Sequence, residues 1–462
     1  MLRLAPANPL PAVLGAAVVV CVELTACVSY HPEPLATQPV MPARIEAGTA
    51  EIPSVSGPPR RAVKIDPADG LDVTEVAALA VLRSPDLKVA RAMSKVARAQ
   101  AFSAGLLPEP QFSLTRDFTL ASTPDVTSAF AVGIAQDISS LVQAPARRRE
   151  RTALEKQADL DLLWQELQTV ARARQLFNQY FASQDAVALL QQQREAAAVR
   201  AAALGTALDR RWVTAASAGA GFAALASIDT LLADSQKQAT ATRLDLHALI
   251  GLAPDAPLQL NAAASWAPFD RAAIEAAKRE VVRRRPDLVA LQAGYAAQEE
   301  RVRIAVLSQF PPLTVSFAQA RDTAGIKTRG FGVSLGLPIF GSGRAAVAIE
   351  RADRERLRTE FDVRLLSTWN DIDVAAESLR LLEQRTPGLE KAVAQLKSVA
   401  SDAALAASSR DIDQLTYADL VEAYVSKQVE LLVARQSRVD LQTTLAALLA
   451  VDPEQLSSGE TE

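Results

Sequence analysis

The sequence predicts an elongated, mainly α-helical protein with a small β part, built as two copies of one unit. Aromatic residues make up only 5% of the 462 residues and glycines number only 19, a composition that favours long helices. The tripeptide Pro-Asp-Leu at 85–87 recurs at 286–288, and matching residues continue without a gap at this offset of 201. In each copy, short segments with apolar residues at every second position interrupt long stretches with apolar residues at helical spacing.

The net charge and the small numbers of cysteines and histidines exclude several classes of function. The net charge is −4, from 49 basic and 53 acidic residues, so no basic excess is present to bind a nucleic acid. The two cysteines are Cys21 and Cys27, and the two histidines are His31 and His247. These four residues form no cluster of metal ligands, and the sequence shows no nucleophile beside a base. We therefore expect neither an enzyme nor a bound cofactor or metal.

The N-terminus has the pattern of a secretory signal. An apolar run at 12–22 is too short to span a bilayer, and Leu-Thr-Ala-Cys at 24–27 matches the bacterial lipobox. We predict that 1–26 is a signal peptide and that Cys27 is lipidated, with Val28 favouring the outer membrane. An ordinary signal or anchor with an incidental Cys27 is the alternative. Residues 27–71 are rich in proline and are predicted to be the lipidated N-terminus and an extended tether that buries no core.

Two repeats follow the tether, at 72–262 and 263–453, with a C-terminal tail at 454–462. Each repeat is predicted to contain a leading helix, a β-hairpin, a very long helix and a returning helix. The predicted ranges are 72–106, 110–138, 147–215 and 222–251 in the first repeat, and 274–308, 311–339, 343–407 and 411–450 in the second. Because a leading and a returning helix together nearly equal the long helix in length, we expect them to stack end to end beside it. Pro387 is expected to break or kink the second long helix.

Each predicted strand has one large apolar face and one small or polar face. At 130–135, for example, Phe, Val and Ile alternate with Ala, Gly and Ala. Four such strands cannot lie alone in lipid, because their edges leave backbone groups unpaired, but three copies would supply the twelve strands of a closed barrel. The alternative is a soluble α+β protein whose hairpins pack on its own helices, and the strand pattern alone does not separate the two interpretations.

Residues 72–452 resemble the TolC-like outer membrane factors. The resemblance rests on Arg-Pro-Asp-Leu at 285–288 with the helix to Pro-Pro-Leu at 311–313, on Leu-Pro-Ile-Phe-Gly-Ser-Gly at 337–343, and on Leu-Ile-Gly at 249–251. It implies a homotrimer with a twelve-stranded transmembrane β-barrel in outer-membrane lipid, continued by a long periplasmic α-helical barrel. It further implies a passive channel of a tripartite efflux or type I secretion system, with a periplasmic adaptor and an inner-membrane transporter as partners.

The resemblance places the periplasmic mouth of such a channel at two helix turns, near 214–222 and 408–413. The candidate gate consists of Arg410, Asp411 and Asp413, because threefold symmetry would turn each aspartate into a ring of carboxylates. The alternative is that Asp411 merely caps the returning helix. The first turn is longer and richer in alanine and glycine than is usual in the family. The candidate contacts for the adaptor are Ser217, Gly219, Gly221, Ser408 and Ser409.

A coiled-coil envelope lipoprotein without a pore is the main alternative to a channel. A pure coiled coil would lack the two alternating hairpins, so the repeat argues against this alternative. An envelope enzyme is disfavoured by the shortage of histidines, cysteines and clustered acids.

Overall fold

The computed structural model describes residues 31–38, 41–53, 60–120, 126–261, 266–337, 341–409 and 411–457. The predicted signal peptide, Cys27 and Arg410 lie outside these residues. The chain divides into two compact units, Met1–Met41 and Pro42–Glu462, and all elements named below belong to the second.

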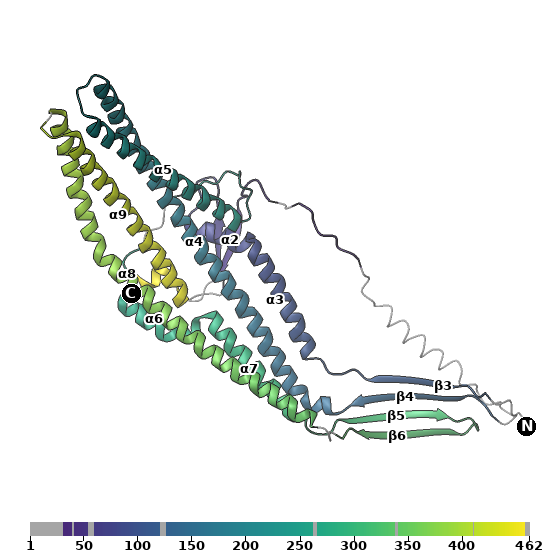
Figure 1. The fold of residues 1–462 in the computed structure, drawn as a ribbon. Helices are drawn as coiled ribbons and strands as arrows, with labels where there is room; N and C mark the ends of the chain where they lie inside the picture. The colour runs from purple at the N-terminus through teal and green to yellow at the C-terminus, as the bar shows by residue number, and fades with distance from the viewer. Residues whose placement is uncertain are drawn as a thin grey trace, which may run out of the picture. The chain divides into compact units, whose positions relative to one another are not determined.

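The second unit contains the predicted order of elements twice (Figure 1). The first repeat comprises α2 (Val73–Arg83), α3 (Pro85–Ala104), β3 (Gln111–Asp117), β4 (Ala129–Asp137), α4 (Ser139–Asp209) and α5 (Ala215–Leu249). The second comprises α6 (Arg271–Arg284), α7 (Pro286–Leu307), β5 (Leu313–Arg321), β6 (Lys327–Leu335), α8 (Ser342–Ser409) and α9 (Gln414–Leu449), followed by the short 3-10 helix η1 (Pro453–Leu456). The predicted fold class, mainly helical with a small β part, is confirmed.

Each leading helix is two helices rather than the single one predicted at 72–106 and at 274–308. The chain leaves the helical conformation at Ser84 (φ −48°, ψ 128°) and at Arg285 (φ −71°, ψ 118°). A proline follows each of these residues, and its ring disfavours helical backbone in the residue before it. Each proline then occupies the first turn of the next helix, where its missing N–H costs nothing.

The long helices α4 and α8 are each continuous. Pro387 lies inside α8 and does not interrupt it, so of the two expected outcomes, a break or a kink, the break is wrong. The proline removes one backbone hydrogen bond, while the Thr386 hydroxyl donates to the Leu382 carbonyl at 2.8 Å in the same turn. Just beyond the proline, Leu389 is buried against Leu431 of α9. This packing against a neighbouring helix offsets the local cost of the proline.

The leading and returning helices share the length of the long helix, as their lengths predict. Both α3 and α5 pack along α4, and both α7 and α9 pack along α8 (Figure 1). The 71 residues of α4 give a helix of roughly 100 Å. One end of α4 and α8 therefore meets the strands, and the other end carries the turns into α5 and α9.

The two hairpins form one antiparallel sheet in the order β3-β4-β5-β6. All four strands lie within the predicted hairpin ranges. Within the first repeat, Leu114 pairs with Val132, and within the second, Val315 pairs with Val333. The repeats are joined by the pairing of β4 with β5, in which Ile134 lies opposite Phe317. The strands β3 and β6 form the edges of this sheet.

Each repeat has its own buried core, where its helices converge halfway along the long helix. The core of the first repeat includes Val76, Leu79, Phe177, Leu246 and Ile250. The core of the second includes Val281, Leu288, Ile372, Leu445 and Leu449. Each such side chain contributes about 1.5–3 kcal/mol when fully buried, so these two clusters hold the helix pairs together.

The structure corrects the expectation that residues 27–71 bury no core. The strands β1 (Gly48–Pro53) and β2 (Arg60–Ile65) form a hairpin, and Ala50, Ile52 and Ile65 are buried in the core of the first repeat. The alternation of Ala50 and Ile52 with Thr49 and Glu51 is a strand pattern that the high proline content obscured.

Candidate channel wall and periplasmic mouth

The register of the four-stranded sheet sorts its side chains into two faces. One face, called the apolar face here, carries the large side chains Phe112, Leu114, Phe130, Val132, Ile134, Leu313, Val315, Phe317, Phe331, Val333 and Leu335. The opposite face, called the small-residue face, carries Ser113, Thr115, Ala131, Gly133, Ala135, Thr314, Ser316, Ala318, Gly332 and Ser334. The period of two predicted from the sequence is therefore present in all four strands.

The apolar face is not covered by the rest of the chain. Phe112 and Phe331 are each 69% exposed, and Phe317 is 50% exposed. Exposed apolar patches larger than a few hundred Å² are rare on soluble monomers and mark contact with lipid or another protein. The exposure contradicts the alternative in which the hairpins pack on helices of the same chain.

Two glycines of the small-residue face lie beside serine hydroxyls of the neighbouring strands. A Cβ atom added at Gly133 would lie 2.8 Å from the Ser113 Oγ atom, and one added at Gly332 would lie 2.6 Å from the Ser316 Oγ atom. Both distances are shorter than real contacts, so a side chain at either glycine would displace the serine hydroxyl beside it. Hydroxyl and glycine surfaces of this kind suit contact with water rather than with lipid.

The first mouth turn differs from its prediction. The turn consists of residues 210–214, and Ser217, Gly219 and Gly221 lie within α5 instead of in a loop at 214–222. Thr214 caps α5 by accepting a hydrogen bond from the Ser217 backbone N–H at 3.2 Å. Alanine is the strongest helix former, and it carries the helix through the intervening glycines.

The two glycines of this segment have different surroundings. A Cβ atom at Gly221 would clash with the Leu204 Cδ1 atom of α4, whereas one at Gly219 would meet nothing within 4 Å. Gly221 therefore allows α5 to approach α4 closely. Gly219 remains on an open surface, as a contact for a partner requires.

The second mouth turn brings several predicted residues together. Asp413, not Asp411, is the cap of α9: its Oδ1 atom accepts a hydrogen bond from the Thr416 backbone N–H at 2.7 Å. The Ser409 hydroxyl donates to the Asp411 Oδ2 atom at 2.5 Å. Both aspartates and Ser408 are exposed.

The two turns border one open groove. Its lining includes Ser217 from α5, Ser408 from the end of α8, and Asp413 and Tyr417 from α9. Trp212 also lines it and is 68% exposed. The structure therefore gathers candidate contacts and a candidate gate residue from both repeats on one surface.

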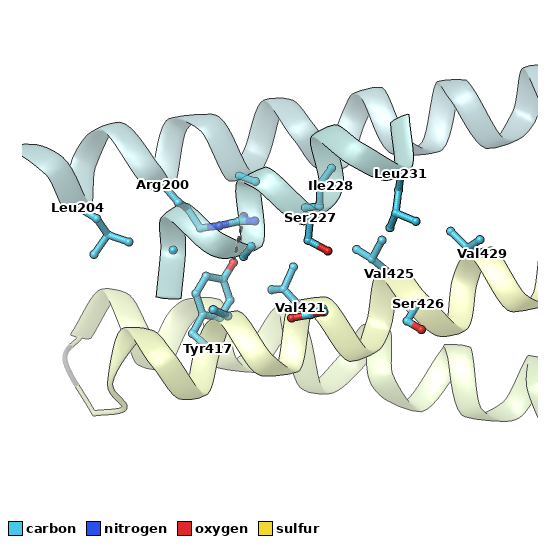
Figure 2. A pocket seen from close by; sticks show the side chains of 15 residues that line it. Arg200, Leu204, Ser227, Ile228, Leu231, Tyr417, Val421, Val425, Ser426 and Val429 are labelled. Atoms are coloured by element: carbon cyan, nitrogen blue, oxygen red, sulfur yellow. Dashed lines mark hydrogen bonds between the residues drawn. The ribbon is translucent and has the colours of Figure 1, made fainter. Parts of the chain in front are cut away.

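A pocket of about 190 Å³ lies between α4, α5 and α9 near this mouth (Figure 2). Figure 2 shows Arg200 of α4 and Tyr417 of α9 directed toward one another across it. The Arg200 guanidinium donates to the Tyr417 hydroxyl at 3.5 Å and lies 5.4 Å from the ring centroid. Beyond this pair, Val421 and Val425 contact Leu190 and Leu232. A weak polar contact and an apolar seam thus connect the two helix pairs.

The contact between Arg200 and Tyr417 was not predicted from the sequence. The two residues are 217 positions apart. Neither residue belongs to a motif, so no local pattern identifies the pair. Only the packing of one repeat against the other brings them together.

His247 is a buried residue of α5. It is 1% exposed in α5, and burial, with a smaller contribution from the Arg243 charge, lowers its pKa from the ordinary value. Across the described ranges of the chain, no group of three His, Cys, Asp or Glu side chains is arranged to hold a metal ion.

These features define a duplicated helical chain whose long helix pairs carry an amphipathic four-stranded sheet at one end. No family profile matches the chain, and no curated protein matches its sequence. Solved structures do match, and several of them are outer-membrane channels.

The fold is that of the TolC-like outer membrane channels. One similar structure is that of CusC, described with the conformational changes that accompany its folding and transmembrane channel formation. It is 14% identical to this chain, 91% of this chain and 99% of CusC are covered, and the TM-score is 0.69. The CmeC outer membrane channel of Campylobacter jejuni is 15% identical, with 84% and 87% covered and a TM-score of 0.70. The open-state MtrE outer membrane channel of Neisseria gonorrhoeae is 17% identical, with 92% and 99% covered and a TM-score of 0.64. The resemblance found in the sequence is confirmed at the level of the fold.

Proposed function

We propose that three copies of this chain form an outer-membrane channel. Their sheets close a twelve-stranded barrel and their helices form a periplasmic tube. The channel is a passive conduit of a tripartite efflux or type I secretion system, working with a periplasmic adaptor and an inner-membrane transporter. The lipidated Cys27 would add an anchor in the same membrane.

The four-stranded sheet is the observation that carries this proposal. Its edges β3 and β6 present unpaired backbone groups, and its apolar face is exposed. Pairing β6 of one subunit with β3 of the next removes every edge, and closure is what a β structure in lipid requires. Closure by three subunits gives the even strand number found in bacterial outer-membrane barrels.

The helices supply a second argument for association. Among the described helices, α5 is the one long and apolar enough to cross a membrane by length and composition, yet few of its residues are buried within the chain. It packs along α4 and leaves a face rich in small apolar residues. A neighbouring subunit would cover this face and allow close helix packing.

The mouth turns are proposed as the regulated end of the channel. Asp411 and Asp413, with Arg410, would form charged rings around the threefold axis, where carboxylates favour cations. Ser217, Gly219, Ser408 and Ser409 would contact the adaptor. The less exposed Gly221 would serve helix packing instead, because a Cβ atom there would meet Leu204.

The alternative of a coiled-coil lipoprotein without a pore is not favoured. Such a protein needs neither the exposed apolar face nor the small-residue face. The solved channels of the same fold are not described as enzymes, which supports a role in transport rather than catalysis.

A disulfide experiment tests the closure of the barrel. Ser113→Cys on β3 is combined in turn with Thr328→Cys, Gly330→Cys, Gly332→Cys or Ser334→Cys on β6, all on the small-residue face. We expect one or two of these pairs to give crosslinked dimers and trimers in outer membranes, and each single variant to give none.

A pair within one chain is the matched control. Ala131 and Ala320 are cross-strand partners in β4 and β5, so a cysteine pair there should crosslink without forming oligomers. If every β3–β6 pair stays monomeric while this control crosslinks, the proposed barrel is wrong.

A further inference from the structure

The charged side chains of the four-stranded sheet are divided completely between its faces. Its four cations are Arg116, Arg321, Lys327 and Arg329, and the register places all of them on the apolar face. Its two carboxylates, Asp117 and Asp137, are on the small-residue face. Such a division concentrates positive charge on the surface that would face lipid.

The cations also gather at one end of the strands. Arg321 lies opposite Lys327 in β6 and opposite Phe130 in β4, and Phe130 in turn lies opposite Arg116. Arg329 lies one step further along the apolar face, beside Gln319. We call Arg116, Arg321, Lys327 and Arg329 the basic row. It lies at the ends of the strands away from the long helices.

The basic row has no acidic partner in the part of the chain that the structure describes. No carboxylate there lies within 4.0 Å of any of its four side chains, and all four residues are exposed. The Arg321 guanidinium donates only to the Ser128 carbonyl at 3.3 Å, and the Arg116 guanidinium lies 5.0 Å from the Phe118 ring. Each cation therefore keeps donors for an external anion.

The apolar residues beside the basic row indicate which other chemical groups the ligand carries. Gln319 lies six positions after Leu313 in β5, so this part of the face is roughly 20 Å tall. Phe317, Phe331 and Leu114 lie next to the cations on the same face. A ligand that contacts both parts has hydrocarbon chains along the strands and an anionic headgroup at their ends.

We propose that the basic row binds the phosphate groups of an acylated lipid in the outer leaflet of the membrane. The proposal rests on the proposed function, which puts the helices in the periplasm and the row at the opposite, outer surface. Arginine binds phosphate with two parallel hydrogen bonds, and long cationic side chains reach from apolar surface to headgroups. In a trimer the row would become a ring of twelve cations around the barrel.

Binding of a defined lipid to the full-length protein in detergent tests the proposal. The probe is a doubly phosphorylated, acylated glucosamine disaccharide, and bound lipid is counted per trimer by native mass spectrometry. The variant replaces all four cations of the row (Arg116→Gln, Arg321→Gln, Lys327→Gln and Arg329→Gln). We expect the affinity to fall about tenfold or more, because each cation near an anionic headgroup adds to binding. Added salt should weaken wild-type binding in the same direction.

A second variant controls for the loss of four charges. Four exposed lysines on the helices, none of them in an ion pair in the described structure, are replaced in it: Lys88→Gln, Lys95→Gln, Lys237→Gln and Lys391→Gln. This control should bind the lipid as the wild type does. The same lipid without phosphates should bind weakly to all three proteins, and millimolar inorganic phosphate should not displace the phosphorylated lipid.

Several outcomes would overturn the proposal. It fails if the variant of the basic row binds as well as the wild type, if the phosphate-free lipid binds equally, or if free phosphate competes fully. If the glutamine variant does not form trimers, two milder variants replace it. The triple variant Arg116→Lys, Arg321→Lys and Arg329→Lys must still bind the lipid, and the double variant Arg321→Gln and Lys327→Gln must bind it more weakly.

Conductance separates this site from the channel itself. In bilayers of zwitterionic lipid, the variant of the basic row should conduct like the wild type. If the variant of the basic row conducts and also binds the lipid as the wild type does, the lipid site is rejected and the proposed channel is not. A wild type that never forms trimers rejects the proposed function, and the lipid site with it.

Discussion

Ile134 of β4 and Phe317 of β5 are cross-strand partners, and through them the hairpins of the two repeats form one sheet. The same line of residues continues to Phe112 on β3 and to Phe331 on β6. An exposed apolar line that crosses a whole sheet marks a surface that lipid or another protein covers. In the proposed channel this line would contact the membrane, and both repeats would contribute to it.

Opposite faces of β5 should respond oppositely to a charge. Phe317→Arg places a cation in the middle of the apolar face and should cost about 2–4 kcal/mol of barrel stability in lipid. Ser316→Arg puts the same side chain on the small-residue face and should leave trimers intact while reducing cation conductance. The yield of heat-resistant trimers in outer membranes measures the difference. Equal loss of trimers in both variants would contradict the assignment of the faces.

The contact between Arg200 and Tyr417 should hold the mouth closed. Tyr417→Phe removes the hydroxyl that accepts the Arg200 hydrogen bond and keeps the ring. At 3.5 Å this hydrogen bond is long, and a contribution of about 1 kcal/mol, within the range of an ordinary hydrogen bond, should raise the open probability severalfold when it is lost. Tyr424→Phe changes a second tyrosine of α9 that borders the same apolar seam and serves as the control. Single-channel recordings in which both variants match the wild type would exclude this role.

Capping and gating can be separated at Asp413. Asp413→Ala removes the acceptor for the Thr416 N–H and should destabilise the start of α9 by about 1 kcal/mol. Asp413→Asn keeps the acceptor and removes the charge, so it should preserve thermal stability and lower cation selectivity. Asp411→Ala should affect selectivity with little effect on stability, because Asp411 does not cap the helix. Unchanged selectivity in both Asp413→Asn and Asp411→Ala would leave these residues with structural roles only.

Gly251 should tolerate substitution less well than Gly325. Both have positive φ values, 63° and 83°, and alanine at either position costs about 1 kcal/mol. A Cβ at Gly251 would also lie 3.1 Å from the Arg83 carbonyl oxygen, whereas Gly325 has nothing within 4 Å. Gly251→Ala should therefore lower the unfolding midpoint more than Gly325→Ala. The reverse order would show that the contact at Arg83 is not restrictive.

His247 should make the folded state less stable in mild acid. Burial lowers its pKa below 6.5, so the unfolded chain binds the proton more readily than the folded one. Its contribution is fully present above pH 6.5 and is lost as the pH falls through 6.5 toward the folded pKa. His247→Gln should flatten this part of the stability profile, measured as unfolding midpoints between pH 7.5 and 5, relative to the wild type and to His31→Gln. A slope that persists in His247→Gln must come from other groups.

Patterns within a single element were enough to predict much of this fold. The offset between Pro85 and Pro286 located both repeats, and the alternation at 130–135 assigned β4 and the orientation of its faces. These signals are local, because strand and helix periods follow from backbone geometry. The single leading helices were wrong because the restriction before Pro85 and Pro286 was given too little weight.

Features that depend on packing between distant segments were not predictable in the same way. The burial of Ile52 and Ile65 depends on a core that includes residues of α4, which lies far along the chain. The pairing of β4 with β5, and the contact of Arg200 with Tyr417, join residues of different repeats. Helix propensity at 215–221 was underestimated because glycines were taken as loop signals, although alanines surround them.

Planar-bilayer conductance of the purified full-length protein tests the central claim most directly. The protein should migrate as a trimer in detergent and give small, discrete, cation-selective openings. The double variant Asp411→Ala/Asp413→Ala should conduct as well, with wider or less selective openings. A well-folded wild-type protein that never forms trimers and never conducts would contradict the channel and favour the structural lipoprotein.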